Sequence, residues 1–328
     1  MRNLFIPNAI YLKSIETLFT RNESFDVSGD DQIKVEFHPT CVAMHPIGLA
    51  FYAAISDNCR KNGVKIISDG INTNIHTIPY LKNMGLFRSL GIKIDTHFEK
   101  HEKSGRFIPL RKIKNSVEME EFLKDIDPIL HGDRTAVPVI KHVFSELLRN
   151  VIEHSKSPYG ANVCATYNRE KKKVSIGISD SGVGILNSLK RSHMVENSAD
   201  ALKLALTPGI TGTTSKLGGN EQNAGAGLFF TKCIAKSTRN YMVLYSGKAL
   251  YKLRATPAKE EVAFNSDPFV DQHTLNKNAP LFRGTLVGID VQIDNSNVFR
   301  NLMASIGDAY TLNVRKSKRD YSRKINFT

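Results

Sequence analysis

The sequence has little that would place it in a membrane or an oxidising compartment. Its four cysteines (Cys41, Cys59, Cys164 and Cys233) form neither a CxxC pair nor a zinc-binding cluster. Such scattered cysteines predict reduced structural thiols in a cytoplasmic protein. No apolar run approaches the roughly 20 residues of a membrane-spanning helix, and residues 1–20 lack the continuous apolar segment of a signal peptide. The sequence therefore predicts no membrane span.

Two common nucleotide-binding motifs are also missing. There is no GxxxxGK[ST] segment, which excludes a P-loop, and no GxGxxG ahead of a helix, which excludes the dinucleotide-binding fingerprint. Internal repeats and low-complexity segments are absent as well. Any nucleotide site must therefore be built in another way.

What the sequence does contain is enough apolar material for about two domains of roughly 150 residues each. Of its 328 residues, 41% are hydrophobic and 23% are charged, with a net charge of +13. Residues 1–134 hold 18 Lys and Arg against 17 Asp and Glu, whereas residues 135–328 hold 27 against 15. The basic second half and its tail fit an anionic ligand, a nucleic acid or a membrane surface, and they also fit plain solubility.

The pattern of residues 1–94 predicts a small α/β unit. Strands are expected at Gln32–His38 and Val64–Ile67, and helices at Ile47–Cys59 and Ile78–Leu90, the last broken near Gly85. Residues 95–134 are charged and contain two prolines, so they predict a connector with a helix over Val117–Ile126.

Residues 135–295 predict a second domain. It begins with a helix over Val137–His154, followed by two strands, a glycine-rich loop, a helix and further strands. The strands are expected at Ala161–Asn168, Val174–Ser179, Tyr241–Tyr245, Ala249–Arg254 and Thr285–Ile293, the loop at Thr207–Gly227 and the second helix at Leu228–Lys236. Residues 296–328 predict a terminal helix, over Val298–Tyr310, and a basic tail.

The first candidate site lies on the polar stripe of the helix over Val137–His154. His142, Glu146, Asn150 and His154 are each four residues apart, so they lie nearly above one another. An amide oxygen suits Mg²⁺, and a carboxylate can orient or deprotonate a water molecule. The alternative is an ordinary solvated helix face.

Two glycine-rich segments complete the pattern. Asp180-Ser-Gly182-Val-Gly184 follows a strand, so its carboxylate can accept an exocyclic amine while the bare backbone lets a flat ring approach. Gly209–Gly227 precedes a helix, and its backbone N–H groups can bind phosphate. Alone, the first fits an Asp-Gly turn and the second a flexible surface loop.

Together and in this order, these segments resemble the nucleotide-binding domain of the GHKL family, to which gyrase, histidine kinases and MutL belong. Glu146-Leu-Leu-Arg-Asn150 is similar to its N box, Asp180–Gly184 to its G1 box and Asn223–Leu228 to its G2 box. The resemblance covers residues 135–295 and implies a Bergerat-type α/β sandwich, with helices on one face of a mixed sheet.

This resemblance also implies roles for individual residues. Glu146 would be the general base and Asn150 the Mg²⁺ ligand, while Asp180, supported by the Thr285 hydroxyl, would hold the adenine of ATP. The remaining cofactor-binding residues would cradle or cover the phosphates: Gly182, Gly184, Thr213, Thr214, Lys216, Gly225 and Gly227. The G2 box departs from the family's Gly-Leu-Gly-Leu, because it reads Gly-Ala-Gly-Leu-Phe-Phe here.

The N-terminal unit resembles a STAS domain, the anti-sigma antagonist fold. The likeness lies in the strand to Phe37, the turn Met44–Leu49 that opens a helix, the strand at Val64 and Met84-Gly-Leu-Phe87. STAS antagonists carry a phosphorylatable Ser in that turn, where this chain has Pro46 and Ile47, so phosphorylation there is excluded. A generic small α/β module is the alternative.

The sequence as a whole thus predicts a two-domain, cytoplasmic Mg-ATP-binding protein. We expect a slow ATPase or an ATP-driven conformational switch, coupled to a protein partner through the N-terminal module. An anti-sigma-type protein serine/threonine kinase and a nucleic-acid-associated ATP sensor using the basic half are the alternatives. The resemblance also implies ATP-dependent homodimers. No long heptad-patterned hairpin precedes Glu146, which argues against histidine kinase activity.

Overall fold

The computed structural model describes residues 2–94, 107–130, 136–210, 227–293, 303–312 and 314–315. Its first part contains β1 (Arg2–Ile6), β2 (Ala9–Ile10), the 3₁₀ segment η1 (Leu12–Phe19), β3 (Gln32–Phe37), β4 (Ala43–Met44), α1 (Pro46–Lys61), β5 (Lys65–Ser68), α2 (Ile78–Asn83) and α3 (Leu86–Leu90). Next come β6 (Phe107–Ile113), α4 (Ser116–Lys124), α5 (Ile126–Ile129), α6 (Ala136–Asn150) and a π-helical turn, η2 (Val151–Ser155). The rest contains β7 (Ala161–Asn168), β8 (Lys173–Asp180), α7 (Gly184–Leu189), α8 (Ser198–Ala205), α9 (Gly227–Ser237), β9 (Met242–Gly247), β10 (Ala249–Leu253), β11 (His273–Asn276) and β12 (Phe282–Gln292).

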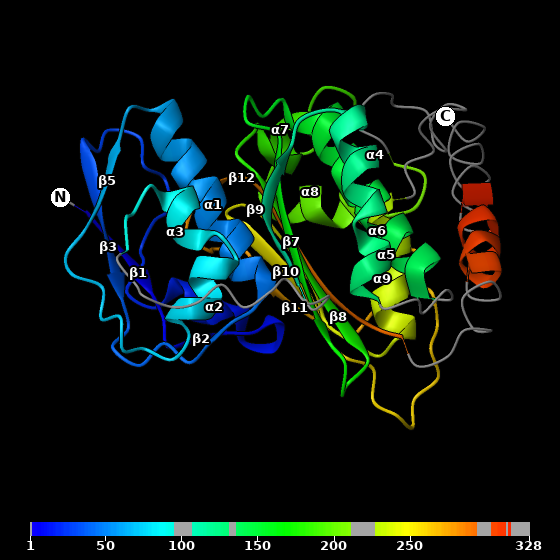
Figure 1. The fold of residues 1–328 in the computed structure, drawn as a ribbon. Coiled ribbons are helices and arrows are strands. Elements are labelled where there is room, and N and C mark those ends of the chain that lie inside the picture. The colour runs from blue at the N-terminus through cyan, green and yellow to red at the C-terminus, as the bar shows by residue number, and fades with distance from the viewer. Residues whose placement is uncertain are drawn as a thin grey trace.

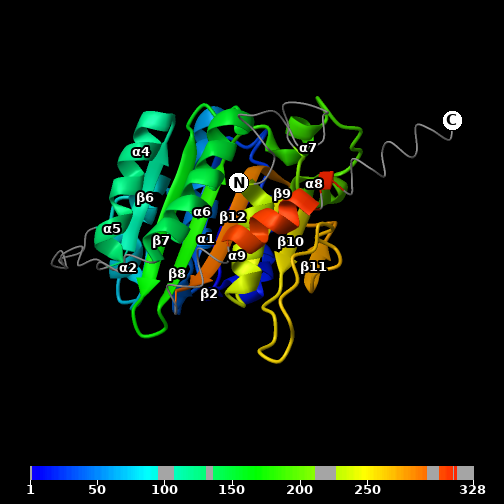
Figure 2. The same cartoon turned by 90° about the vertical axis from the view of Figure 1, so that its right-hand side faces the viewer.

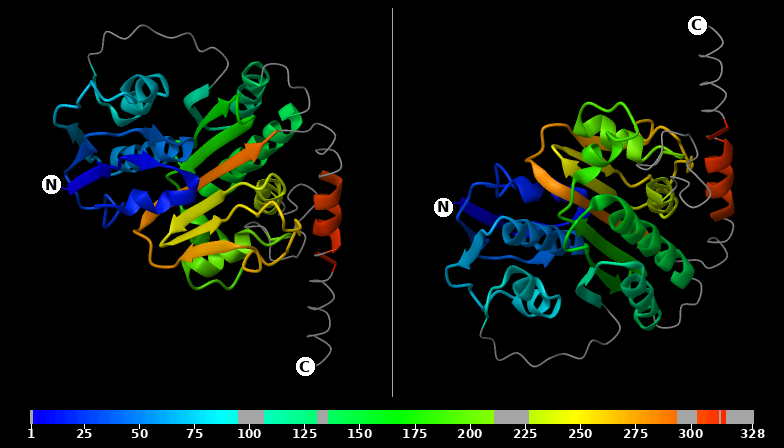
Figure 3. Two further views of the ribbon diagram at one scale, coloured as in Figure 1. Left: turned by 90° about the horizontal axis from the view of Figure 1, so that it is seen from below. Right: turned by 90° about the horizontal axis from the view of Figure 1, so that it is seen from above.

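A seven-stranded sheet forms the centre of the molecule, in the order β11-β10-β9-β12-β8-β7-β6. Helices α4, α6 and α9 cover one of its faces, and α1 covers the other (Figure 1). Beyond α1 lies a parallel sheet of three strands, β1-β3-β5. Figure 2 looks onto the face covered by α6 and α9, and Figure 3 shows the N-terminal unit on the opposite side of the sheet.

The prediction of a mixed sheet for the second domain is wrong, because every pair of neighbouring strands in the seven-stranded sheet is antiparallel. Strands β7 and β8 form a hairpin, as do β9 and β10, and a tight turn joins only antiparallel strands. Strand β12 then inserts between β8 and β9, antiparallel to both. The expectation of an α/β protein is confirmed at this coarser level.

The segment predicted to be a connector contains an edge strand of this sheet. Strand β6 pairs with β7, and the register shifts between Ile108 and Arg111, around Pro109. Proline cannot donate a ladder hydrogen bond, so within a sheet it is tolerated only at an edge strand or a bulge. Pro109 lies at a bulge in an edge strand. Its presence made the sequence look like a linker. Helix α4 covers most of the helix expected at Val117–Ile126.

Helix α1 is buried on all sides because it lies between the two sheets. Every residue from Pro46 to Cys59 is buried. Pro46 occupies the first turn, and the His45 imidazole caps the helix by accepting the Ile47 N–H at 3.1 Å. A helix that is apolar around its whole circumference is typical of such a buried position. Most expected elements are confirmed with small changes of boundary, whereas the following were not predicted: β1, β2, η1, β4, β6, α5, α7, α8 and β11.

Two glycines let α1 approach the central sheet closely. Gly177 of β8 faces Gly288 of β12 in the antiparallel register. A Cβ atom on Gly177 would lie 2.3 Å from the carbonyl carbon of Pro46, and one on Gly288 would lie 2.5 Å from the Ile47 side chain. The start of α1 therefore sits in a depression in the sheet that only glycine provides.

Buried polar groups also join α1 to the sheet. His45 Nε2 lies 3.0 Å from Asp290 Oδ1, and Lys173 Nζ lies 2.8 Å from the other oxygen of this carboxylate. Burial raises the pKa of Asp290, but hydrogen bonds from His45, Lys173 and Ser175 outweigh it and hold that pKa below its usual value. Further along α1, Asp57 accepts a hydrogen bond from Asn162 at 2.9 Å.

None of the helices within the described ranges is long and apolar enough to cross a membrane. Of the predicted terminal segment, residues 303–312 are helical, and residues 316–328 of the basic tail lie outside the description.

The glycine depression gives a test of the packing between α1 and the sheet. Gly177→Ala places a methyl group against the Pro46 carbonyl, and we expect a loss of about 3 kcal/mol in the free energy of unfolding. Urea denaturation measures this loss. Gly307→Ala is the matched control, because its Cβ meets nothing within 4 Å and alanine favours a helix. Equal stability of the two variants would contradict the close approach.

Candidate functional site

Asp180 lies at the end of β8, on the face of the sheet that α6 and α9 cover. Alternate residues of a strand point to opposite faces. Ile176 and Ile178 belong to the core beneath α6 and α9, whereas Ser179 donates a hydrogen bond to Ala50 of α1. Asp180 therefore shares the face of Ile178. Thr285 is its partner in β12, so the two side chains are neighbours on that face.

The Asp180 carboxylate is buried and hydrogen-bonded. Only 1% of the residue is exposed, and its Oδ1 accepts the Gly182 N–H at 2.7 Å. Burial raises the pKa of Asp180 to about 6, although hydrogen bonds from Gly182 and from the Thr285 side chain and backbone act in the opposite direction. Thr285 thus lies beside Asp180 in the sheet, and the support of an adenine-binding Asp180 by its hydroxyl stays a prediction.

Glu146 and Asn150 come together with Gly227 at the start of α9. A Cβ atom on Gly227 would lie 2.6 Å from Glu146 Oε2 and 3.4 Å from Asn150 Nδ2. Glu146 is 19% exposed and pairs with Arg149 at 3.1 Å. Because residue 227 is a glycine, the backbone at the start of α9 can approach the Glu146 and Asn150 side chains of α6 closely.

The Asn150 carboxamide contains a buried polar atom that stays unsatisfied within the described ranges. Its Nδ2 has no hydrogen-bond partner among the described residues. Rotation of the carboxamide by 180° exchanges nitrogen and oxygen, so the same position can present an oxygen to a cation. No group of three His, Cys, Asp or Glu side chains in the described ranges could hold a metal ion. A metal here would therefore need ligands from its substrate and from water.

The polar stripe on α6 is only partly regular. The helix continues beyond Asn150 as the π-helical turn η2, so His154 no longer follows the four-residue spacing. His142 packs edge-on against Phe230 of α9, and its buried Nε2 has no partner among the described residues. Burial lowers the pKa of His142, with Glu146 acting in the opposite direction.

The turn after Asp180 is held by contacts that the sequence did not predict. The Val183 N–H donates to the Ser155 carbonyl at 2.8 Å, and the Ile185 N–H donates to Ser246 Oγ at 3.0 Å. A Cβ atom on Gly182 would lie 2.0 Å from the Ser155 oxygen, and Gly184 has a φ of +75°. Both glycines are thus required by the chain itself, whether or not a ring approaches them. Ser155 and Ser246 carry no local sequence signal, because they act on a segment distant in the sequence.

The structure therefore forms two half-sites on one face of the sheet. One is Asp180 with Thr285, and the other is Glu146 and Asn150 with Gly227. The hydrogen bond from Val183 to Ser155 connects them, since Ser155 ends the turn that continues α6. The predicted phosphate-binding residues Thr213, Thr214, Lys216 and Gly225 lie outside the described residues.

Comparison with known proteins adds no family to this geometry. No family model matches the chain, and no similar sequence is found among the curated proteins.

The raised pKa of Asp180 makes stability depend on pH. The folded chain holds this proton up to about pH 6, whereas an ordinary Asp has a pKa of 3.8. The folded state therefore binds more protons between these values, and the free energy of unfolding falls by about 3 kcal/mol as pH rises from about 4 to about 6. Below about pH 4 Asp180 does not change the free energy of unfolding with pH, because it is protonated in both states. Above about pH 6 it is ionised in both states, so the loss of free energy stays constant.

Asp180→Asn removes this titration but keeps an acceptor oxygen for the Gly182 N–H. We expect the variant to gain stability relative to the native chain by about 3 kcal/mol between pH 4 and pH 6, measured by denaturant unfolding at each pH. Asp31→Asn, at an exposed carboxyl, is the control. Parallel pH profiles for Asp180→Asn and the native chain would contradict a buried titrating carboxyl.

Proposed function

We propose that the chain binds Mg-ATP on the face of the sheet covered by α6 and α9. The observation that carries this proposal is the meeting of Glu146 and Asn150 with Gly227, on the same face as the buried Asp180 and its half-buried neighbour Thr285. The four side chains come from three elements, α6, β8 and β12, and match the roles that the resemblance to the GHKL family implies. We further propose that binding drives slow hydrolysis or a conformational switch, coupled to a protein partner through the N-terminal unit.

Asp180 suits recognition of adenine. With a pKa near 6 its carboxylate is mostly ionised at neutral pH, and an ionised carboxylate is purely a hydrogen-bond acceptor. It can accept a hydrogen bond from the exocyclic amine of adenine. Guanine presents a carbonyl oxygen at that position, and two acceptors facing each other repel. Adenine is therefore favoured over guanine.

Asn150 and Glu146 suit the metal and the water. The carboxamide of Asn150 offers a hard, neutral oxygen of the kind that Mg²⁺ accepts, and Mg²⁺ commonly keeps few protein ligands alongside phosphates and waters. Bound Mg²⁺ would neutralise phosphate charge. The Glu146 carboxylate is partly exposed and oriented by Arg149, so it can accept the proton of an attacking water. These residues thus fit the proposed cofactor.

The adenine contact is tested by calorimetry with ATP, ADP and GTP, with and without magnesium. Asp180→Asn replaces one carboxylate oxygen with a donor, and we expect ATP affinity to fall by about tenfold or more. Asp31→Asn, at an exposed carboxyl, should leave the affinity unchanged. Because Asp180→Asn is expected to be at least as stable as the native chain at neutral pH, unfolding would not explain a loss. An unaltered ATP affinity would rule out this role for Asp180.

The role of Glu146 is tested by turnover. Glu146→Gln keeps the size of the side chain but removes the base, so we expect ATP binding to persist while hydrolysis falls by about 10²- to 10⁴-fold. Glu121→Gln, on the exposed face of α4, is the control. With γ-labelled ATP and cell extract, release of free phosphate supports an ATPase, whereas label on protein supports the kinase alternative. Full turnover by Glu146→Gln would refute the assignment.

A further inference from the structure

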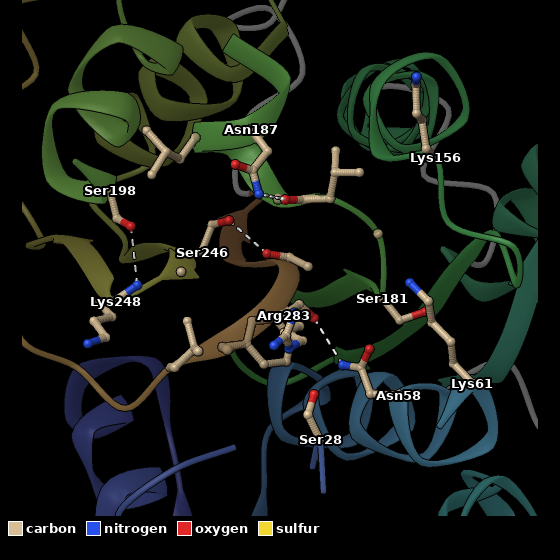
Figure 4. A pocket seen from close by; sticks show the side chains of 18 of the residues that line it. Ser28, Asn58, Lys61, Lys156, Ser181, Asn187, Ser198, Ser246, Lys248 and Arg283 are labelled. Carbon is tan, nitrogen blue, oxygen red and sulfur yellow. Dashed lines mark hydrogen bonds between the residues drawn. The ribbon is translucent and has the colours of Figure 1, made fainter. Parts of the chain in front are cut away.

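A cavity of about 550 Å³ opens at the end of the central sheet, where the N-terminal unit meets the turn after Asp180. Its walls come from the C-terminal end of α1, the turn Ser181–Gly184, the start of α8, the β9–β10 turn and the start of β12. Figure 4 shows Asn58 and Lys61 of α1 on one side of the cavity and Asn187 of α7 on the other.

Four basic side chains line this cavity: Lys61, Lys156, Lys248 and Arg283. They come from four separate segments of the chain, and no acidic residue is among the described residues that line it. Figure 4 shows Lys61 extending toward Ser181, with Lys156 and Lys248 at opposite sides. The fold thus places positive charge around the rim of one concave site, with the ammonium groups of Lys156 and Lys248 directed outward in Figure 4.

Most of this charge is uncompensated. Arg283 forms two hydrogen bonds with Asp26, at 2.8 and 2.9 Å, which fix its guanidinium in place. None of Lys61, Lys156 and Lys248 forms a salt bridge with a carboxylate among the described residues. All four residues are exposed, so solvent screens their charges. Even so, several like charges around one concave site attract an anion more strongly than isolated charges do.

The cavity is distinct from the proposed nucleotide site. It contains none of Glu146, Asn150, Asp180, Gly227 and Thr285, and it shares with that site only the turn Gly182–Gly184. The N–H groups of Gly182 and Val183 are already bonded within the chain. Recognition here therefore depends on side chains: ammonium groups, hydroxyls and carboxamides.

We propose that this cavity binds a small phosphate-bearing anion. Lysine ammonium groups bind phosphate as point charges. The Ser198 hydroxyl, which accepts the Lys248 N–H at 3.3 Å, can donate a hydrogen bond to the ligand. The volume exceeds what a single inorganic phosphate needs, so the ligand carries either several phosphates or a phosphate on an organic group. A bound anion would contact both the N-terminal unit and the turn after Asp180, which makes the cavity an effector site. This proposal does not rest on the proposed ATP binding.

The test is calorimetry of the full chain with sodium pyrophosphate, at constant ionic strength. Magnesium and nucleotide are left out, because the proposed nucleotide site needs Mg²⁺ to hold phosphates and a nucleoside diphosphate could itself enter the cavity. We expect Lys61→Gln and Lys248→Gln each to weaken pyrophosphate binding by about three- to tenfold, and the double variant to weaken it further. Lys65→Gln, an exposed lysine of β5 outside the cavity, is the matched control and should bind normally.

Two further arms identify the ligand chemistry. Sulfate at equal ionic strength should bind more weakly than pyrophosphate, because it carries less charge. Uridine diphosphate should bind more tightly if the ligand has an organic group, and equally if it is an inorganic polyphosphate. Absence of pyrophosphate binding, or unchanged binding by the double variant, would overturn the proposal. Failure of the nucleotide site would instead appear as normal ATP affinity in Asp180→Asn, with pyrophosphate binding intact.

Discussion

The enclosure of α1 between two sheets is the constraint on which the rest of the structure depends. A helix buried around its whole circumference must be apolar and must lie close to both neighbours. Gly177 and Gly288 provide that closeness on one side, and the Asp290 and Asp57 networks satisfy the polar groups buried with it. The N-terminal unit and the central sheet therefore share an interface that resembles the interior of a single domain.

The candidate site depends on this arrangement through the register of the central sheet. The pairing of β8 with β12 that opposes Gly177 and Gly288 also opposes Asp180 and Thr285, because both pairs lie on the same two strands. A shift by one residue would move Asp180 to the face occupied by α1 and remove its support. The packing of α1 against Gly177 and Gly288 therefore also sets which residues lie beside each other on the opposite face. The two glycines thus help to position Asp180 and Thr285 without contacting them.

The sequence predicted local features well and distant pairings poorly. Periodicity identified α1, α6, β7 and β8, and the four-residue spacing along α6 gave a polar stripe that includes Glu146 and Asn150. Periodicity missed β6, because Pro109 marks a bulged edge strand as easily as a linker. The mixed sheet was implied by the resemblance to the GHKL family, and periodicity could not correct it because it does not decide strand direction. Ser155, Ser246 and the cationic cavity could not be predicted, because each depends on segments that meet only after folding.

Coverage of both faces of the central sheet bears on how a signal could travel through the molecule. Since α1 occupies one face and α6 with α9 the other, neither side can release its cover without exposing apolar strands to water. Communication between the two units by docking and undocking would therefore be strongly unfavourable. Small displacements of strands β8 and β12 would cost less free energy than undocking. Both strands contact α1 on one face and the α6 and α9 layer on the other, so such displacements could couple the two units.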